Sequence, residues 1–321
     1  MGVREARLAV GTAAQRMATV RSIFVDANET LASIAERFAA SRGPPIIVNR
    51  QPDIRPAAVP AVVDGFEIAI IDHTALPTDV ARQCASLKHV VFLGTGARSY
   101  MNPEELAGLG IDVHTIKGYG DTAVAECAIA LMWSAARGFT LMDREMRAGR
   151  WLRSDAMQLT GRTIGLLGFG GIAAEVARLA AGCGMRVKAW NRSPKTHPGV
   201  EFVELDRLLL DSDVLSVHLL LTEETKTFLS RERIASMRPG AILINTARGA
   251  LVDEDAMIDA LRSGHIRHAG LDVYAVEPLP AGHVLTTLPN VTLSAHSAFR
   301  TAEASENLIG AALAHCRRIA G

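Results

Sequence analysis

Short apolar runs alternate with stretches of helical spacing along most of the chain. Runs of this length, bounded by helices, are typical of βαβ units and predict a parallel sheet. In the first part of the chain, strands are expected at 23–26, 46–48, 66–71 and 90–93. In the second part, the same pattern predicts strands at 163–167, 186–190, 214–219, 241–245, 268–271 and 291–294.

One long helical stretch separates the two sets of strands. It covers 122–137, is rich in alanine, and is expected to continue past Gly138 toward Arg147. A closing helix is predicted over 301–319. The chain has 321 residues, and because one hydrophobic core rarely grows past ~250–300 residues, two domains are expected.

The charges of the chain balance. Lys and Arg total 34, as do Asp and Glu, and 49% of the residues are hydrophobic. This composition is typical of a globular protein and excludes a strong electrostatic preference for nucleic acid or an anionic membrane. No run reaches the ~18 apolar residues that a membrane helix needs. We therefore expect neither nucleic acid nor membrane as a partner.

The cysteines, Cys84, Cys127, Cys183 and Cys316, lie far apart, and no Cys/His spacing suggests a metal site. Reduced thiols in a cytoplasmic protein are the expectation. Residues 1–21 contain four arginines but no continuous apolar segment. We therefore expect an extension before the first strand, and no secretory signal.

A glycine-rich turn lies between a predicted strand and a predicted amphipathic helix. Its residues, Gly168, Gly170, Gly171, Ile172 and Ala173, fit the pattern G-x-G-x-x-[G/A]. The glycines permit a tight turn and a close approach of the backbone to a pyrophosphate, which the helix N-terminus favours. The context of strand, turn, helix and second strand indicates dinucleotide binding. The alternative is a turn that serves packing alone.

The end of the second strand predicts which nicotinamide cofactor is bound. NAD enzymes usually carry Asp or Glu there to accept from the ribose 2′-hydroxyl. This chain has Asn191, Arg192 and Ser193, with no acid before Glu201. Arg192 and Ser193 could bind a 2′-phosphate, so NADP is favoured over NAD. The alternative is that Arg192 is solvated and both cofactors bind.

Three polar motifs follow successive strands and contribute Arg248, Glu277 and His296. Ligands of open α/β sheets bind beyond the carboxyl ends of the strands, so these side chains could converge. Arg is a fixed cation for a carboxylate and a carbonyl oxygen, His exchanges a proton near neutral pH, and a carboxylate can orient the His. Taken alone, each could be a structural residue; together they predict an active site.

Several motifs in order resemble the D-isomer-specific 2-hydroxyacid dehydrogenases, from about Ile23 to the C-terminus. They are GFGGIA, HLLLTEET, MRPGAILINTARGALVDEDA, GLDVYAVEPLP and LPNVTLSAHSA. The resemblance implies an α/β fold with a Rossmann dinucleotide-binding domain inserted into a flavodoxin-like substrate domain. The expected division is 1–119 for the substrate domain, 120–295 for the Rossmann domain, and 296–321 for a helix returning to the substrate domain. The helix after Thr122 would form a homodimer contact.

The family also implies roles for individual residues. Arg248 would bind the substrate carboxylate, His296 would donate the proton, and Glu277 would hold His296. Substrate contacts are expected from the loop formed by Gly94, Thr95 and Gly96. Further cofactor contacts are expected from Leu219, Thr225, Thr246, Ala247 and Asp272.

The resemblance predicts reduction of a small 2-keto acid to a D-2-hydroxy acid, with glyoxylate or hydroxypyruvate favoured. The segment Ala97–Tyr100 departs from the family pattern in the substrate loop. The alternatives are a D-3-phosphoglycerate dehydrogenase without its regulatory domain and a protein that senses NAD(H) without turnover. Keto-acid-dependent oxidation of the cofactor would distinguish them.

Overall fold

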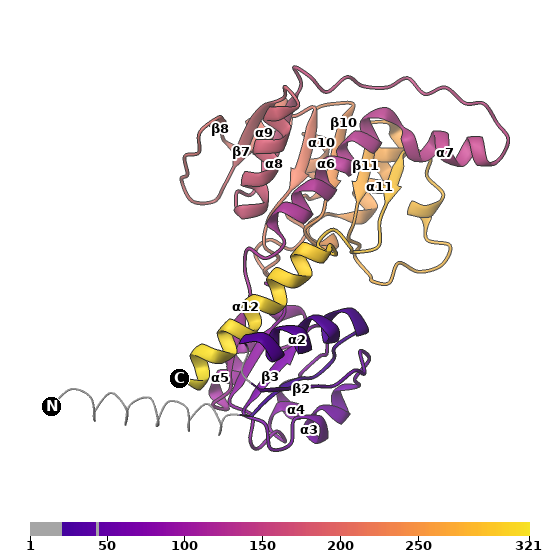
Figure 1. Cartoon of the computed structure of the whole chain (residues 1–321). Coiled ribbons are helices and arrows are strands. Elements are labelled where there is room, and N and C mark those ends of the chain that lie inside the picture. The colour runs from indigo at the N-terminus through magenta and orange to yellow at the C-terminus, as the bar shows by residue number, and fades with distance from the viewer. Residues whose placement is uncertain (1–20, 43–44) are drawn as a thin grey trace. The chain divides into compact units, whose positions relative to one another are not determined.

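The structure is a computed structural model that describes residues 21–42 and 45–321. The extension expected at residues 1–21 therefore lies almost wholly outside the described residues. The chain forms two compact units (Figure 1): unit 1 is the part up to Gly120 together with Thr301–Gly321, and unit 2 is Asp121–Arg300.

Unit 1 is built on a parallel five-stranded sheet with the order β2-β1-β3-β4-β5. This is the flavodoxin-like order. Its strands are β1 (Ser22–Phe24), β2 (Ile46–Val48), β3 (Ile68–Ile71), β4 (His89–Phe92) and β5 (Asp112–Thr115). Its short helices are α3 (Val59–Val62), α4 (Thr78–Ala81) and α5 (Pro103–Gly108).

The last helix of the chain belongs to unit 1. Helix α12 (Ala302–Ala320) packs against α2 (Glu29–Arg42), as Figure 1 shows. Thr301 caps its N-terminus by accepting a hydrogen bond from the backbone N–H of Ala304. Its apolar face, including Leu308 and Ile309, is buried in the same core as β3.

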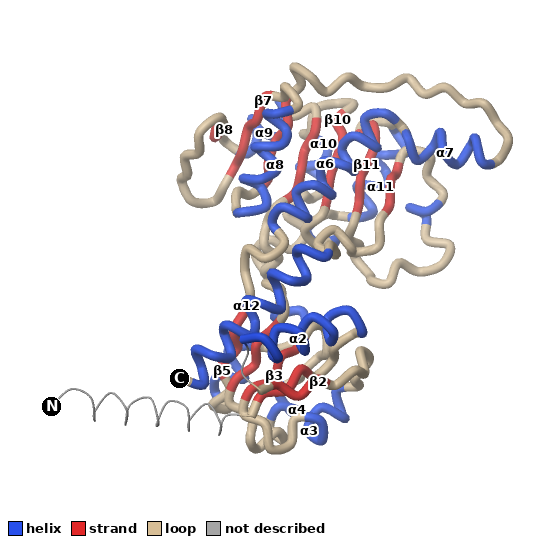
Figure 2. Tube along the Cα trace, viewed as in Figure 1, coloured by secondary structure: helices blue, strands red, loops and turns tan. Residues whose placement is uncertain are grey.

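Unit 2 carries a parallel seven-stranded sheet with the order β12-β11-β10-β9-β6-β7-β8 and helices on its faces (Figure 2). Its strands are β6 (Thr163–Leu167), β7 (Arg186–Trp190), β8 (Val200–Phe202), β9 (Val214–Val217), β10 (Ala241–Asn245), β11 (Ile266–Leu271) and β12 (Val291–Leu293). Its further helices are α8 (Gly171–Gly182), α9 (Leu205–Asp211), α10 (Arg231–Ala235) and α11 (Glu254–Ser263). This is the Rossmann strand order with one added strand, which confirms the predicted fold class.

The direction of winding reverses between β6 and β9, because the chain moves outward through β7 and β8 and then returns to the other side of β6. Ligands of doubly wound sheets bind in the crevice at this point. The glycine-rich turn follows β6, so the fold brings the turn to the expected place.

The helical stretch after unit 1 continues past Gly138 to Arg147 as expected, but a bend at Gly138, which was not predicted, divides it into two helices. Helix α6 (Asp121–Arg137) ends at Gly138, and α7 (Phe139–Arg147) continues at an angle of 65°. Gly138 has a φ of 65°, a left-handed conformation that stops a helix. In the described part of the chain, no single helix could span a membrane; α6 and α7 meet the length and composition test only as this bent pair.

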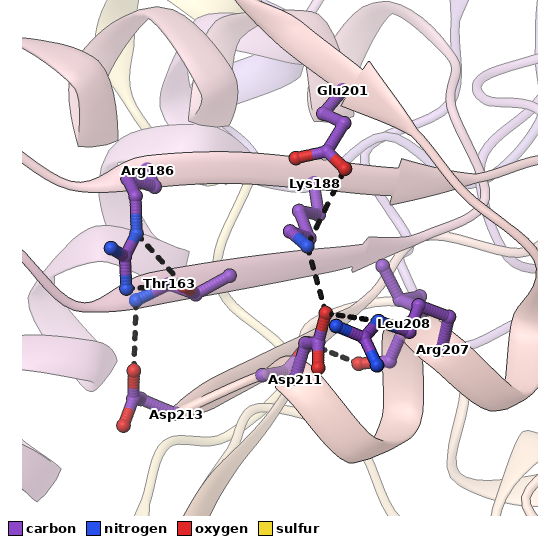
Figure 3. A network of polar contacts seen from close by, with 9 residues as sticks. Thr163, Arg186, Lys188, Glu201, Arg207, Leu208, Asp211 and Asp213 are labelled. Atoms are coloured by element: carbon purple, nitrogen blue, oxygen red, sulfur yellow. Dashed lines mark hydrogen bonds and ion pairs between the residues drawn. The ribbon is translucent and has the colours of Figure 1, made fainter.

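A polar network lies in the unit 2 sheet, toward the amino ends of the strands and away from the glycine-rich turn (Figure 3). The buried Asp213 carboxylate accepts from the backbone N–H of Thr163 at 2.9 Å and pairs with Arg162 at 3.1 Å. Lys188 in β7 pairs with Asp211 at 2.8 Å. Because buried charges need partners, the Asp213 contacts anchor the starts of β6 and β9, and the Lys188 pair connects β7 to the end of α9.

Candidate active site

The glycine-rich turn after β6 has the geometry of an anion cradle. Gly168 has a φ of 92°, and its N–H donates to the carbonyl of Trp190 at 2.9 Å. A Cβ on Gly168 would lie 2.8 Å from the backbone oxygen of His218, so a larger residue cannot take its place. Helix α8 starts at Gly171, and its N-cap Gly170 provides no side-chain cap. The first N–H groups of α8 are therefore available to a pyrophosphate.

A buried hydroxyl also indicates that a ligand belongs here. Thr246, directly after β10, is buried, and its Oγ1 has no hydrogen-bond partner within the described residues. Buried polar atoms are normally paired, so an unpaired one requires an explanation. Thr246 is one of the predicted cofactor contacts, and a nicotinamide dinucleotide would supply the missing partner. The residues present therefore fit the cofactor.

The side chains after β7 are arranged around the turn. Asn191 Oδ1 accepts from the backbone N–H of Phe169 at 3.2 Å, and its Nδ2 donates to the carbonyl of Ser193 at 2.8 Å. Arg192 is exposed and pairs with Glu224 at 2.8 Å. Lys195 Nζ donates to the carbonyl of Phe169 at 2.6 Å. Sequence reasoning missed Lys195, although its place two residues after Ser193 was a usable signal for a second cation.

The loop after β9 supports the turn from the other side. Leu219 contributes the side-chain atom nearest to Gly168, at 3.0 Å from a hypothetical Cβ. Thr225 Oγ1 donates to the carbonyl of Leu220 at 2.6 Å and accepts from the N–H of Thr222 at 2.7 Å. Thr225 thus closes its own loop, and its contact with a cofactor stays a prediction. Desolvation lowers the pKa of His218 to about 4, so this ring is neutral near pH 7 and acts structurally.

Asp121 at the start of α6 is a residue that sequence reasoning did not assign to the site. Its Oδ2 would lie 1.9 Å from a Cβ on Gly171, so the carboxylate fills the space that a side chain there would need. Burial, and then the charge of Glu175, raise the pKa of Asp121. A carboxylate thus lies beside the N-terminus of α8.

The two proposed catalytic side chains form a close pair. His296 Nδ1 lies 2.6 Å from Glu277 Oε2, and Glu277 Oε1 accepts from the backbone N–H of Tyr274 at 2.9 Å. Burial alone would raise the pKa of Glu277, but the hydrogen bonds from His296 and Tyr274 outweigh it and lower this pKa below its usual range. The carboxylate is therefore ionised and accepts the Nδ1–H of the imidazole.

The backbone around His296 is held in an unusual conformation. His296 has a φ of 46°, in the left-handed region that non-glycine residues rarely adopt, and its N–H donates to the carbonyl of Asp272 at 2.7 Å. The fully buried Asp272 carboxylate accepts from Ser294 Oγ at 2.6 Å and from the N–H groups of Ser297 and Ala298 at 3.0 and 2.9 Å. Asp272 was predicted to contact the cofactor; in the structure its carboxylate fixes the loop that carries His296.

Arg248 lies on the neighbouring strand end. Its Nη1 donates to the carbonyl of Ala247 at 2.7 Å. Asn245, at the end of β10, holds the same loop: its Nδ2 donates to the carbonyl of Arg248 at 2.9 Å, and its Oδ1 accepts from the N–H of Ala247 at 3.0 Å. The charge of Arg248 also contributes to the lowered pKa of Glu277. Arg248, Glu277 and His296 therefore share one end of the unit 2 sheet. The predicted domain boundary before His296 would separate the pair, whereas unit 2 continues to Arg300.

The predicted substrate loop lies in unit 1, where Gly94, Thr95 and Gly96 follow β4. Gly94 has a φ of 144°, which only glycine adopts readily. Arg98 in the next turn binds Glu104, and the ring of Tyr100 packs on Phe92 with centroids 5.3 Å apart. Arg98 and Tyr100 thus stabilise this loop, and its contact with substrate stays a prediction.

Comparison with known proteins agrees with this geometry. The family pattern described as "D-isomer specific 2-hydroxyacid dehydrogenase, NAD binding domain" matches residues 129–298. A hydroxypyruvate reductase of Thermotoga maritima is 36% identical over 241 residues, which are 73% of this chain and 78% of the relative. A glyoxylate reductase of Aeropyrum pernix is 37% identical over 252 residues, 72% of this chain and 75% of the relative.

A solved structure extends the likeness to nearly the whole chain. It is an acyclic imino acid reductase in complex with NADPH and D-Arg, with a TM-score of 0.81 and 27% identity. The match covers 91% of this chain and 94% of that chain. Both units of the protein therefore have counterparts in a nicotinamide-dependent reductase.

Proposed function

This chain belongs to the D-isomer specific 2-hydroxyacid dehydrogenase family, and we propose that it reduces glyoxylate or hydroxypyruvate with NADPH in preference to NADH. The family reaction is hydride transfer between a nicotinamide cofactor and a 2-keto or 2-hydroxy acid. The observation that carries the proposal is the His296–Glu277 pair, 2.6 Å apart, beside Arg248 and the anion-binding turn.

Reduction adds a hydride to the carbonyl carbon and a proton to the carbonyl oxygen of the substrate. When the reduced cofactor is bound, its nicotinamide ring supplies the hydride. Arg248 retains N–H donors beyond the one that binds Ala247. In our proposal they grip the substrate carboxylate and polarise the carbonyl, as a planar guanidinium can.

His296 donates the proton. Its Nδ1–H is held by the Glu277 carboxylate, so Nε2 is the ring atom that remains for the substrate. An ionised carboxylate next to the ring stabilises the imidazolium form, which is the acid that reduction requires. After the reaction the imidazole is neutral, and it can take the proton back in the oxidation of a hydroxy acid.

The choice of substrate and cofactor follows from the relatives and from charge. The two relatives compared above are named hydroxypyruvate reductase and glyoxylate reductase, and the matched structure holds NADPH. Arg192 and Lys195 place two cations after β7, where an NAD enzyme would have an acid. The names of the relatives favour a small keto acid as substrate. The NADPH of the matched structure and the two cations favour a cofactor with a 2′-phosphate.

Initial rates with a panel of acids test this proposal. Glyoxylate, hydroxypyruvate, 3-phosphohydroxypyruvate, pyruvate and phenylpyruvate are each assayed with NADPH and NADH. We expect the highest kcat/KM for NADPH with glyoxylate or hydroxypyruvate. A preference for NADH of tenfold or more would refute the cofactor assignment, and turnover confined to 3-phosphohydroxypyruvate would favour a phosphoglycerate dehydrogenase instead.

The proposed assembly is a homodimer formed through α6, α7 and the segment after them. Phe139 and Met146 on α7 are 52% and 55% exposed, and Trp151 and Leu152 beyond it are 76% and 41% exposed. Such a group of exposed apolar side chains is typical of an interaction surface. Light scattering should give the mass of a dimer, and Met146→Ser with Trp151→Ser should shift it toward the monomer. Ile47→Ser, at an exposed apolar position in unit 1, is the matched control.

We also propose that the enzyme acts in the cytoplasm. The four cysteines are free thiols in the structure, which suits a reducing compartment. Cell fractionation with an antibody against the chain would test this assignment.

A further inference from the structure

An ion pair connects the two loops on either side of the glycine-rich turn. Arg192 Nη1, after β7, lies 2.8 Å from Glu224 Oε2, in the loop after β9. In the sheet, β6 lies between β7 and β9. The pair therefore spans the carboxyl end of the strand that carries the turn, at the point where the winding of the sheet reverses.

Both loops rest directly on the turn, so the position of the pair is fixed by the fold. Next to Arg192, Asn191 binds the N–H of Phe169 through its Oδ1 at 3.2 Å. On the other side, the N–H of His218 donates to the carbonyl of Leu167 at 2.8 Å. The Glu224 carboxylate is thus paired with Arg192. Arg192 follows Asn191, which stands at the position that recognises the adenosine ribose.

We propose that Glu224 sets cofactor selectivity by competing with the 2′-phosphate of NADP for Arg192. The inference rests on the proposed use of Arg192 in NADPH binding and adds a residue that opposes it. The phosphate of NADPH would share the Arg192 guanidinium with Glu224, whose carboxylate holds one of its donors and repels a second anion. NADH has only a hydroxyl at this position and can leave the pair intact. Glu224 thereby lowers the preference for NADPH below the level that Arg192 and Lys195 would otherwise give.

The pair is weak enough to be displaced. Arg192 and Glu224 side chains are 79% and 77% exposed, and exposed pairs of this kind change an equilibrium only about two- to fivefold. A phosphate carries more charge than a carboxylate and offers more acceptor oxygens, so it can take Arg192 from Glu224. Lys195 makes no ion pair with any described residue and remains as a second cation beside the turn.

Calorimetric titration of the full chain measures the effect without turnover. The probes are adenosine 2′,5′-bisphosphate and adenosine 5′-monophosphate, which differ only in the 2′-phosphate. The quantity of interest is the ratio of their dissociation constants for wild type, Glu224→Gln, Arg192→Ala and the double variant. Glu223→Gln is the matched control, because Glu223 is exposed, adjacent, and forms no ion pair in the described part of the chain.

We expect Glu224→Gln to raise selectivity for the 2′-phosphorylated probe about two- to fivefold, with no such gain in Glu223→Gln. In the Arg192→Ala background, removal of Glu224 should give a clearly smaller gain. The inference is overturned if the Glu224 and Glu223 variants behave alike, or if the gain is equally large without Arg192. A wild type that prefers the monophosphate would refute NADPH preference, yet the Glu224-specific gain would still support the competition.

Discussion

The substitution Glu277→Gln tests how the His296 imidazolium is stabilised. Gln keeps the length of the side chain, and its carbonyl oxygen can still accept from the N–H of Tyr274, as Glu277 does at 2.9 Å. Its amide nitrogen then faces His296 Nδ1. Two donors cannot pair, so the imidazolium loses its partner while the neutral ring gains one.

The expected loss can be worked from the geometry of the pair. A hydrogen bond to a charged group contributes ~1.5–3 kcal/mol. Because the His296 and Glu277 side chains are 36% and 33% exposed, solvent screening reduces this to ~1–2 kcal/mol. That corresponds to a fall in kcat/KM for reduction of about 5- to 30-fold.

The assay is the pH profile of kcat/KM in both directions. Because the two directions share one transition state and one overall equilibrium constant, oxidation should lose as much as reduction does at each pH. Glu254→Gln is a matched control, since Glu254 pairs with His283 at 3.3 Å in the same unit but away from the site; it should leave both profiles unchanged. A loss no larger than that of Glu254→Gln would refute the proposed role of Glu277.

Three further changes probe other parts of the site. His296→Ala should lower turnover by ~10²–10⁴, the usual scale for a general acid, while calorimetry shows cofactor affinity unchanged; a normal rate would remove His296 from the mechanism. Arg248→Lys should lower kcat/KM about tenfold or more, because Lys lacks the planar fork, and unchanged steady-state constants would exclude a clamp. Asp121→Asn should tighten cofactor binding about two- to fivefold at neutral pH by removing a charge beside the N-terminus of α8. Since burial raises the pKa of Asp121, its charge is lost as the pH falls, so titrations should show this gain vanish in acid; a gain independent of pH would contradict it.

Strands with a clear apolar run could be predicted from the sequence, while strands without one could not. Strands β6, β7 and β10 have the predicted bounds, because their apolar runs have clear ends. Strands β5 and β8 were missed because charged or polar residues interrupt their short sequences; the equally peripheral β2, Ile46–Val48, is wholly apolar and was predicted. Their sequences therefore lack the apolar run that marks a buried strand.

The bend at Gly138 could not be predicted from the local sequence pattern. A glycine inside a helical stretch is often tolerated, and the pattern on both sides of Gly138 is helical. The bend coincides with a change in packing: α6 is held against α8 and the sheet, whereas every residue of α7 is at least partly exposed and the helix keeps a hydrogen bond between Thr140 and Thr292 in β12 at 3.0 Å.

The residues of the candidate site could likewise be predicted only in part. The types and order of Arg248, Glu277 and His296 were visible in the sequence, since each follows a strand end. The roles of Glu224, Lys195 and Asp121 depend on loops distant in sequence that meet at the turn. The position of Lys195 after Ser193 was a usable signal, but the contacts of Glu224 and Asp121 leave no local pattern, so only the structure reveals them.

The most direct test of the account counts product against cofactor. Purified protein is incubated with NADPH and hydroxypyruvate, and the D-hydroxy acid formed is measured with a stereospecific assay alongside the NADPH consumed. We predict one D-hydroxy acid per NADPH with wild type and almost none with His296→Ala. Tight cofactor binding without any keto-acid-dependent oxidation of NADPH or NADH would contradict it and would indicate a nucleotide sensor.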